Sequence, residues 1–149
     1  MGQFTSKILA EFQPPKKWKL GRDLVYTTSD LYANEVKALK DVGVEIVRDT
    51  NKTETITVPT GFITDLASTP RLLWNVIAPF DVARAAIVHD LLYKSIRQYR
   101  WTKGLIEEDK ELIKNAKKAS DKVFLLAMKD AEPKVSGWKI YCAWKAVDL

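Results

Sequence analysis

The segment ARAAIVHDLLYKS, residues 83–95, contains the only histidine of the chain, and its apolar residues recur with a helical period. At 3.6 residues per turn, one face collects a stripe of apolar side chains with the histidine at its centre: Val82, Ala85, Ala86, His89, Leu92, Tyr93 and Ile96. This pattern predicts a helix that buries His89 against a core. Asp90 lies about 100° around the helix, where it can pair with Lys94 four residues later.

Helical signals continue from residue 69 to the end of the chain. Ser68 or Thr69 can cap a first helix that has Pro70 near its first position, where a missing N–H costs nothing. A charged and then apolar helix is expected over about 107–131, before Pro133. A last helix is expected in VSGWKIYCAWKAV, residues 135–147, where an internal glycine weakens it.

Residues up to about 60 carry a different pattern, with β-branched and aromatic residues between turn formers. Short antiparallel strands are expected in SKILAEF, WKLGRDLVYTT, VGVEIVRD and ETITVP, which are residues 6–12, 18–28, 42–49 and 54–59. Pro14 and Pro15 separate the first two, and residues 48–55 form a hairpin loop. Strands followed by helices predict one α+β domain, residues 1–149, in which a small N-terminal antiparallel sheet packs against three or four C-terminal helices.

Composition limits the class of protein. The chain has 149 residues, 46% of them hydrophobic, which suits one globular domain with a sizeable core. We find no secretory signal pattern and no apolar run long enough for a membrane span. The single cysteine cannot form an internal disulfide, so we expect packing alone to stabilise the fold.

The net charge is +5, from 24 basic and 19 acidic residues. The densest basic stretch, residues 94–122, alternates lysine and arginine with glutamate and aspartate. Mixed signs at helical spacing are typical of a solvated helix face and argue against nucleic acid as a partner.

The segment VPTGFITDLASTPR, residues 58–71, places polar side chains at a junction between a strand and a helix. Thr64, Ser68 and Arg71 are candidate binding residues, because helix N-termini present free N–H groups that suit a carboxylate or phosphate. The alternative is structural, with Asp65 and Ser68 capping the turn and the helix.

Taken together, these two segments resemble a known family. The motif G-F-x-T-D-x-A-S-x-P-R followed by H-D-x-L-Y is the signature of a domain-of-unknown-function family of tailed bacteriophages and prophages. Asp121 falls in a segment similar to the family's A-D-x-x-F helix, although Ser120 stands where alanine is usual and the charged lead into this helix is longer. The resemblance covers most of residues 20–148 and implies a phage genome, but no reaction.

Three hydrolytic templates compete for this site. A metal phosphohydrolase of the His-Asp type needs several histidines, and a zinc peptidase needs two or three nitrogen or sulfur ligands, whereas this chain has one histidine. HDLLY is similar to the H-D-x-x-Y helix motif of phospholipase A2. That resemblance implies His89 as general base, Asp121 orienting it, Tyr93 supporting the second carboxylate, and Asp65 with Asp90 holding calcium. The glycine-rich calcium loop and the disulfides of those enzymes are absent.

A binding role in the virion is the competing class and the one we favour from sequence. His89, Asp65, Arg71 and Asp121 would then form a structural polar network, and exposed aromatic residues of the last helix would contact other virion proteins. The expected location is the particle, in the tail or tail tip, assembled in the host cytoplasm, with the host cell envelope as a further partner. Two geometric predictions follow: Asp65, His89 and Asp121 meet, and Trp138 and Trp144 differ sharply in burial.

Overall fold

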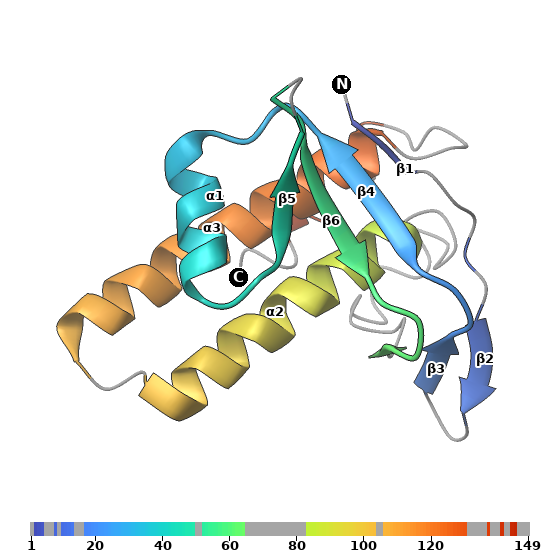
Figure 1. Cartoon of the computed structure of the whole chain (residues 1–149), viewed down its shortest axis with the longest axis horizontal. Coiled ribbons are helices and arrows are strands. Elements are labelled where there is room, and N and C mark those ends of the chain that lie inside the picture. Colours follow the sequence, from blue (N-terminus) through green and yellow to red (C-terminus); the bar gives the residue numbers. More distant parts are fainter. Residues whose placement is uncertain are drawn as a thin grey trace.

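The computed structural model describes residues 2–4, 8, 10–13, 17–49, 52–64, 83–103 and 106–130, with the single positions 137, 141, 144 and 145. The elements within these residues are β1 (Gln3–Phe4), β2 (Ala10–Gln13), β3 (Lys17–Leu20), β4 (Leu24–Thr28), α1 (Ala33–Asp41), β5 (Ile46–Arg48), β6 (Glu54–Val58), β7 (Ile63–Thr64), α2 (Ala83–Lys103) and α3 (Glu107–Lys129) (Figure 1). The predicted α+β class and the antiparallel strands are confirmed. The helices expected near 69–80 and 135–147 lie largely outside the described residues.

The strands form two sheets rather than the one predicted. The first has the order β1-β4-β6-β5 and the second the order β2-β3-β7, and every pairing is antiparallel. The single strand expected over residues 18–28 is therefore wrong. The chain bends at residues 21–23, so that β3 pairs with β2 and β7 whereas β4 pairs with β1 and β6.

The junction between the two sheets is tied by hydrogen bonds. The Asp23 carboxylate accepts bonds from the Thr60 amide at 2.7 Å and from its hydroxyl at 2.8 Å. The backbone of Leu20 bonds to the connection between β6 and β7. Its amide donates to Phe62 O at 2.9 Å, and its carbonyl accepts a bond from the Gly61 amide at 2.8 Å. Gly61 has φ +89°, a conformation that glycine adopts at no steric cost. These bonds fix the direction in which the chain leaves β6 for β7.

Helix α1 lies within the part of the chain predicted to be mainly strands. Its first turn is stabilised by Glu35, whose carboxylate accepts a 2.8 Å bond from the Tyr32 amide. Val36 and Leu39 are buried in the core. Lys122 Nζ of α3 donates to Glu35 Oε1 at 2.7 Å and lies 4.0 Å from the centre of the Tyr32 ring. These contacts attach α1 to α3.

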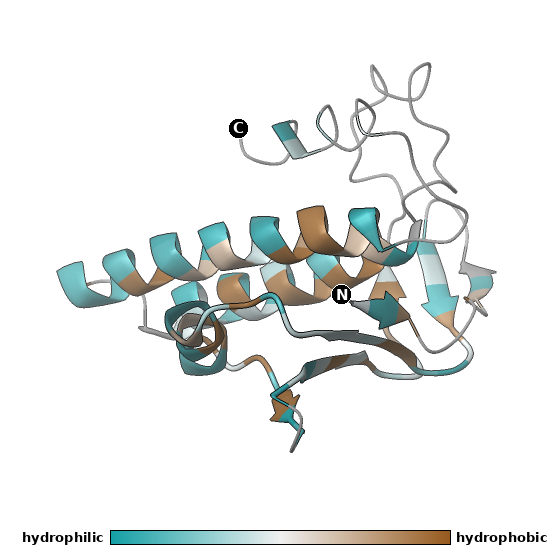
Figure 2. Ribbon diagram, turned by 90° about the horizontal axis from the view of Figure 1, so that it is seen from above, coloured by the Kyte–Doolittle hydropathy of each residue, from teal (hydrophilic) through white to brown (hydrophobic). Residues whose placement is uncertain are grey.

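The two long helices lie on one side of the larger sheet (Figure 2). Helix α2 contacts β4 and β6 as well as α3, and α3 also packs against α1. The largest fully buried side chains come from both strands and helices: Leu20, Leu24, Tyr26, Leu39, Ile56, Val58, Ile87, Val88, Leu92 and Met128. Within the described part of the chain, no helix combines the length and apolar character that a bilayer crossing requires.

Candidate functional site

His89 lies on the buried side of α2, as its sequence pattern predicts, with 6% of its surface exposed. The predicted face is confirmed for Ala85, Ala86, Leu92 and Ile96, which are all buried, and Tyr93 is half-buried. Ile87 and Val88, outside the predicted stripe, are also fully buried. The reason is that α2 lies between the sheet and α3, so that two of its sides face apolar neighbours.

The polar centre of the site is one carboxylate on the facing helix. His89 Nε2 lies 2.9 Å from Asp121 Oδ1, and the Tyr93 hydroxyl donates to the same oxygen at 2.5 Å. Asp121 is 3% exposed. The prediction that His89 and Asp121 meet is thus confirmed, across 32 residues of sequence. Tyr93 holds the second carboxylate as the resemblance to the phospholipase motif implies.

Two aromatic rings fix the orientation of the imidazole. The Tyr93 ring centre lies 4.0 Å from that of His89 at an interplanar angle of 43°, and the Phe124 ring centre lies 4.9 Å away at 37°. Tyr93 is one turn along α2 from His89, and Phe124 is three residues after Asp121 on α3. The residues that position the histidine therefore follow from helical spacing on both helices.

The position of the carboxylate decides which tautomer of His89 is favoured. A carboxylate beside Nε2 accepts a proton from that nitrogen, so the neutral ring carries its hydrogen on Nε2. The lone pair is then on Nδ1. This arrangement leaves Nδ1 as the nitrogen that can accept a proton in chemistry.

Ser120, next to Asp121 on α3, does not disturb the site. Its side chain is fully buried, and its hydroxyl donates to Ala116 O at 2.8 Å, one turn back along α3. This local bond satisfies the hydroxyl, so the buried serine adds no unpaired polar group beside Asp121.

Asp90 does not follow the predicted pairing with Lys94. Its carboxylate lies 3.8 Å from Arg97 Nη2, and 13% of its side chain is exposed. Lys94 Nζ instead donates to Ile63 O and lies 4.4 Å from the centre of the Phe62 ring. The pairing prediction is wrong because β7 and the residue before it give Lys94 a carbonyl and an aromatic face.

The bond from Lys94 to Ile63 O also holds β7, which lies within the predicted binding segment 58–71, against α2. Thr64, at the end of β7, is 2% exposed and pairs with Trp18 of β3. The other residues of that loop, Asp65, Ser68 and Arg71, lie outside the described residues, and so does Trp138. The predictions that Asp65 joins His89 and that two tryptophans differ in burial stay predictions; Trp144 is half-buried against the core.

The described residues do not fit a calcium site. No group of three or more His, Cys, Asp or Glu side chains among them could hold a metal ion. Calcium takes about six to eight oxygen ligands. Asp90 offers one carboxylate, which already faces a guanidinium.

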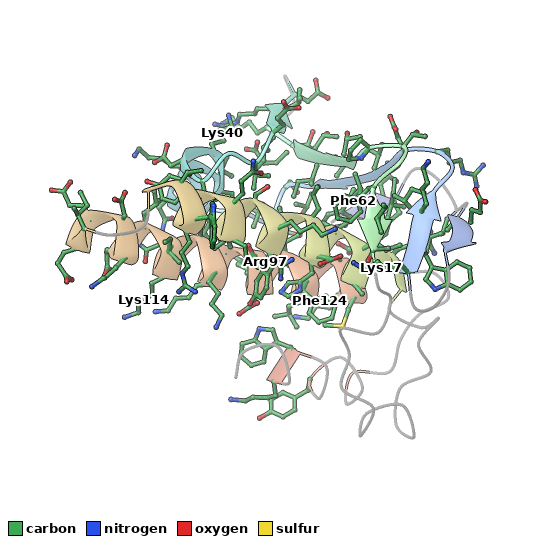
Figure 3. All side chains as sticks on the ribbon, turned by 90° about the horizontal axis from the view of Figure 1, so that it is seen from below. Lys17, Lys40, Phe62, Arg97, Lys114 and Phe124 are labelled. Atoms are coloured by element: carbon green, nitrogen blue, oxygen red, sulfur yellow. The ribbon has the colours of Figure 1, made fainter. Side chains whose placement is uncertain are left out.

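A cavity of about 220 Å³ opens beside Tyr93, between α2 and α3. It is lined by Tyr93, Ile96, Arg97, Arg100, Ile113 and Lys117. Figure 3 shows the side chains of the two helices, with Arg97 labelled on α2 and Phe124 on α3. The mixed charges of residues 94–122 predict a solvated face for these cations. The missed signal is the spacing 93, 96, 97 and 100, which places four lining residues on one side of α2.

Comparison with known proteins gives one family. The family model described as "Protein of unknown function (DUF1353)" matches residues 40–147, which include α2, α3 and the site. No curated protein and no solved structure gives a significant match to the chain.

Proposed function

This chain belongs to the DUF1353 family of proteins of unknown function, and from its site we propose that it is a hydrolase in which His89 activates water. The observation that carries the proposal is the bond between His89 Nε2 and Asp121 Oδ1, with Tyr93 holding the same oxygen. A histidine fixed in this way by a carboxylate is the arrangement that general-base catalysis uses.

The proposed step is the hydrolysis of an acyl ester. A water molecule gives a proton to His89 Nδ1 while its oxygen bonds to the acyl carbon. The bond from that carbon to the leaving oxygen then breaks, and the imidazolium returns the proton to the leaving oxygen. Asp121 stabilises the imidazolium between these events.

The surroundings of the pair support this role in two ways. His89 and Asp121 are both nearly buried, and a low dielectric strengthens the interaction between the imidazolium and the carboxylate. The Tyr93 and Phe124 rings pack against the imidazole and hold its orientation. Esters of the host cell envelope are the proposed substrates.

The test uses a variant that keeps the structural bond. His89→Gln places an amide N–H where Nε2 lies, so it can still donate to Asp121, but it has no basic nitrogen. We expect its melting temperature to stay within a few degrees of the wild type. Hydrolysis of a panel of chromogenic acyl esters and phospholipids should fall by about 10²–10⁴-fold, the usual contribution of a general base.

The control is Lys114→Gln, which changes an exposed residue of α3 away from the pair. It should leave both melting temperature and hydrolysis unchanged. If His89→Gln is as active as this control, or if the wild-type protein cleaves no member of the panel, the hydrolase proposal is wrong.

A virion-associated role in the phage tail or tail tip is the second proposed function. Exposed aromatic side chains favour it: Trp101 on α2 is 90% exposed and Tyr141 is 57% exposed. Such residues are enriched where proteins bind one another. In this role the His89 network fixes α2 to α3, and the partners are other virion proteins. Mass spectrometry of purified particles should find the chain, and its absence would refute this role.

A further inference from the structure

The cavity between α2 and α3 concentrates positive charge. Arg97 and Arg100 of α2 and Lys117 of α3 line it, and all three side chains are exposed. Arg97 is the only one of them that the described ion pairs include, at 3.8 Å from Asp90. In that part of the chain, Arg100 and Lys117 have no carboxylate partner, so the cavity has an excess of cationic donors.

The floor of the cavity is apolar. Ile96 and Ile113 are each 7% exposed, and both line it. Guanidinium groups bind phosphate and carboxylate through paired hydrogen bonds, and a lysine adds a point charge. A volume of about 220 Å³ is below the range of roughly 300–1,000 Å³ typical of drug-sized ligands. The cavity thus suits an anionic group of a ligand together with the first carbons attached to it.

We propose that this cavity is a binding site for a phosphate group, held by Arg97, Arg100 and Lys117, with Ile96 and Ile113 in contact with the adjoining carbons. The ligand is either a small phosphate ester or the headgroup of an anionic phospholipid. Trp101, next to Arg100 in the chain, is 90% exposed at the same end of α2 and would contact a lipid surface.

The cavity adjoins the His89 pair through Tyr93. The Tyr93 side chain lines the cavity, and its hydroxyl donates to Asp121 Oδ1. A phosphate bound there would lie beside the proposed catalytic pair, and it would mark the substrate class as a phosphate-bearing ester. This last point rests on the proposed hydrolase; phosphate binding itself does not.

The first experiment measures the binding of inorganic phosphate by calorimetry and by amide chemical shifts. The variants are Arg100→Gln and Lys117→Gln. The control is Lys114→Gln, which removes the same charge from an exposed position of α3 (labelled in Figure 3) that is not among the residues lining the cavity. We expect the dissociation constant to rise about tenfold or more in each cavity variant, because bonds to charged groups are individually strong. It should change less than twofold in the control.

The outcomes distinguish a specific phosphate site in the cavity from non-specific attraction of phosphate to the positive surface. Equal weakening by Lys114→Gln and Lys117→Gln, or no phosphate binding by the wild type, would overturn the proposal. All variants should keep the wild-type melting temperature, because their side chains are exposed. His89→Gln should bind phosphate like the wild type, so loss of hydrolysis and loss of binding are distinguishable results.

A second experiment identifies the source of the phosphate. Vesicles of phosphatidylcholine with and without phosphatidylglycerol are sedimented with the protein. Binding that needs phosphatidylglycerol, is inhibited by inorganic phosphate and falls in Arg100→Gln identifies a lipid headgroup. Phosphate binding without vesicle binding identifies a soluble phosphate ester. Vesicle binding that Arg100→Gln and inorganic phosphate both leave unchanged would contradict the proposal for lipid.

Discussion

One oxygen atom, Asp121 Oδ1, accepts hydrogen bonds from two side chains of α2, so each bond can be removed separately. His89→Ala leaves the buried carboxylate with Tyr93 alone among these partners. An unsatisfied buried group costs about 1–3 kcal/mol. We therefore expect the melting temperature to fall by several degrees, at about 2–4 °C per kcal/mol for a chain of this size. Tyr93→Phe keeps the ring against His89 and should cost less, about 1 kcal/mol.

Thermal unfolding of these two variants and of His89→Gln checks the prediction that His89→Ala lowers the melting temperature more than Tyr93→Phe does. If His89→Ala is as stable as the wild type, the hydrogen bond from the imidazole to Asp121 does not stabilise the fold. That result would argue against a structural role for the pair.

Tyr26 gives a prediction about pH. Burial raises the pKa of Tyr26 above the ordinary value of 10.0, and the hydrogen bond from its hydroxyl to Asp130 at 2.6 Å raises this pKa further. The stabilisation due to the protonated hydroxyl is complete below the unfolded pKa and is lost as the pH rises above it toward the folded pKa. We expect the free energy of unfolding to fall above about pH 10.

Urea denaturation of the wild type and of Tyr26→Phe at several pH values measures this effect. The pKa of Tyr99 is also raised, by its bond to Asp109, so only the difference between the two proteins reports on Tyr26. Identical slopes above pH 10.0, the ordinary pKa of this group, would contradict the prediction.

At the scale of the element, α1 depends on one carboxylate. The Glu35 carboxylate accepts a hydrogen bond from the Tyr32 amide at the start of the helix and a second one from Lys122 Nζ of α3. Glu35→Ala removes both bonds, and we expect about 1 kcal/mol of destabilisation, typical of a lost helix cap. Amide hydrogen exchange should accelerate in residues 33–41 more than in α2.

The matched control is Lys37→Ala, which breaks a pair with Asp41 on the exposed side of the same helix. An exposed pair of this spacing contributes only a few tenths of a kcal/mol. If both variants change exchange in α1 equally, the contact with α3 has no special part in holding this helix.

The sequence allows α2 and α3 to be predicted but not α1, and the reason is the length of the pattern. The stripe around His89 repeats over four turns, whereas α1 has only Val36, Ala38 and Leu39 as buried residues within nine positions. The pair of His89 with Asp121 follows once two long amphipathic helices are known. The cationic cavity depends on how α2 and α3 are placed side by side, which local patterns do not specify.

At the scale of the whole molecule, the two sheets are another feature beyond local pattern. Residues 18–28 alternate like one strand, and the division at residues 21–23 depends on pairing with β6 and β7, far along the chain. Register and partner choice are long-range properties of a sheet. A single sheet was therefore the natural prediction, and the antiparallel class was correct because it depends only on short strands and turns.

The Gly61→Ala substitution measures how much the junction between the two sheets contributes to the stability of the fold. The Gly61 φ of +89° disfavours any other residue, although a methyl group there would meet none of the described residues within 4 Å. Gly61→Ala should therefore cost about 1–2 kcal/mol through backbone conformation alone. Gly137→Ala is the control, because that exposed glycine also has no neighbour within 4 Å among the described residues and no left-handed φ. Denaturation midpoints measure the stability of both variants, and the midpoint of Gly61→Ala should be the lower one. Equal midpoints for the two variants would contradict the prediction.

The placement of the His89 pair on an antiparallel hairpin limits how this family can change in length. His89 is 14 residues before the end of α2 at Lys103, and Asp121 is 14 residues after the start of α3 at Glu107 (103 − 89 and 121 − 107). Both are therefore about 21 Å from the turn, at 1.5 Å per residue.

A residue added to one helix between the pair and the turn would rotate its side of the pair by about 100° and move it by about 1.5 Å. Equal additions to both helices would lengthen the hairpin outward and leave the pair in register. Insertions and deletions in related chains should accordingly occur in matched numbers on the two helices.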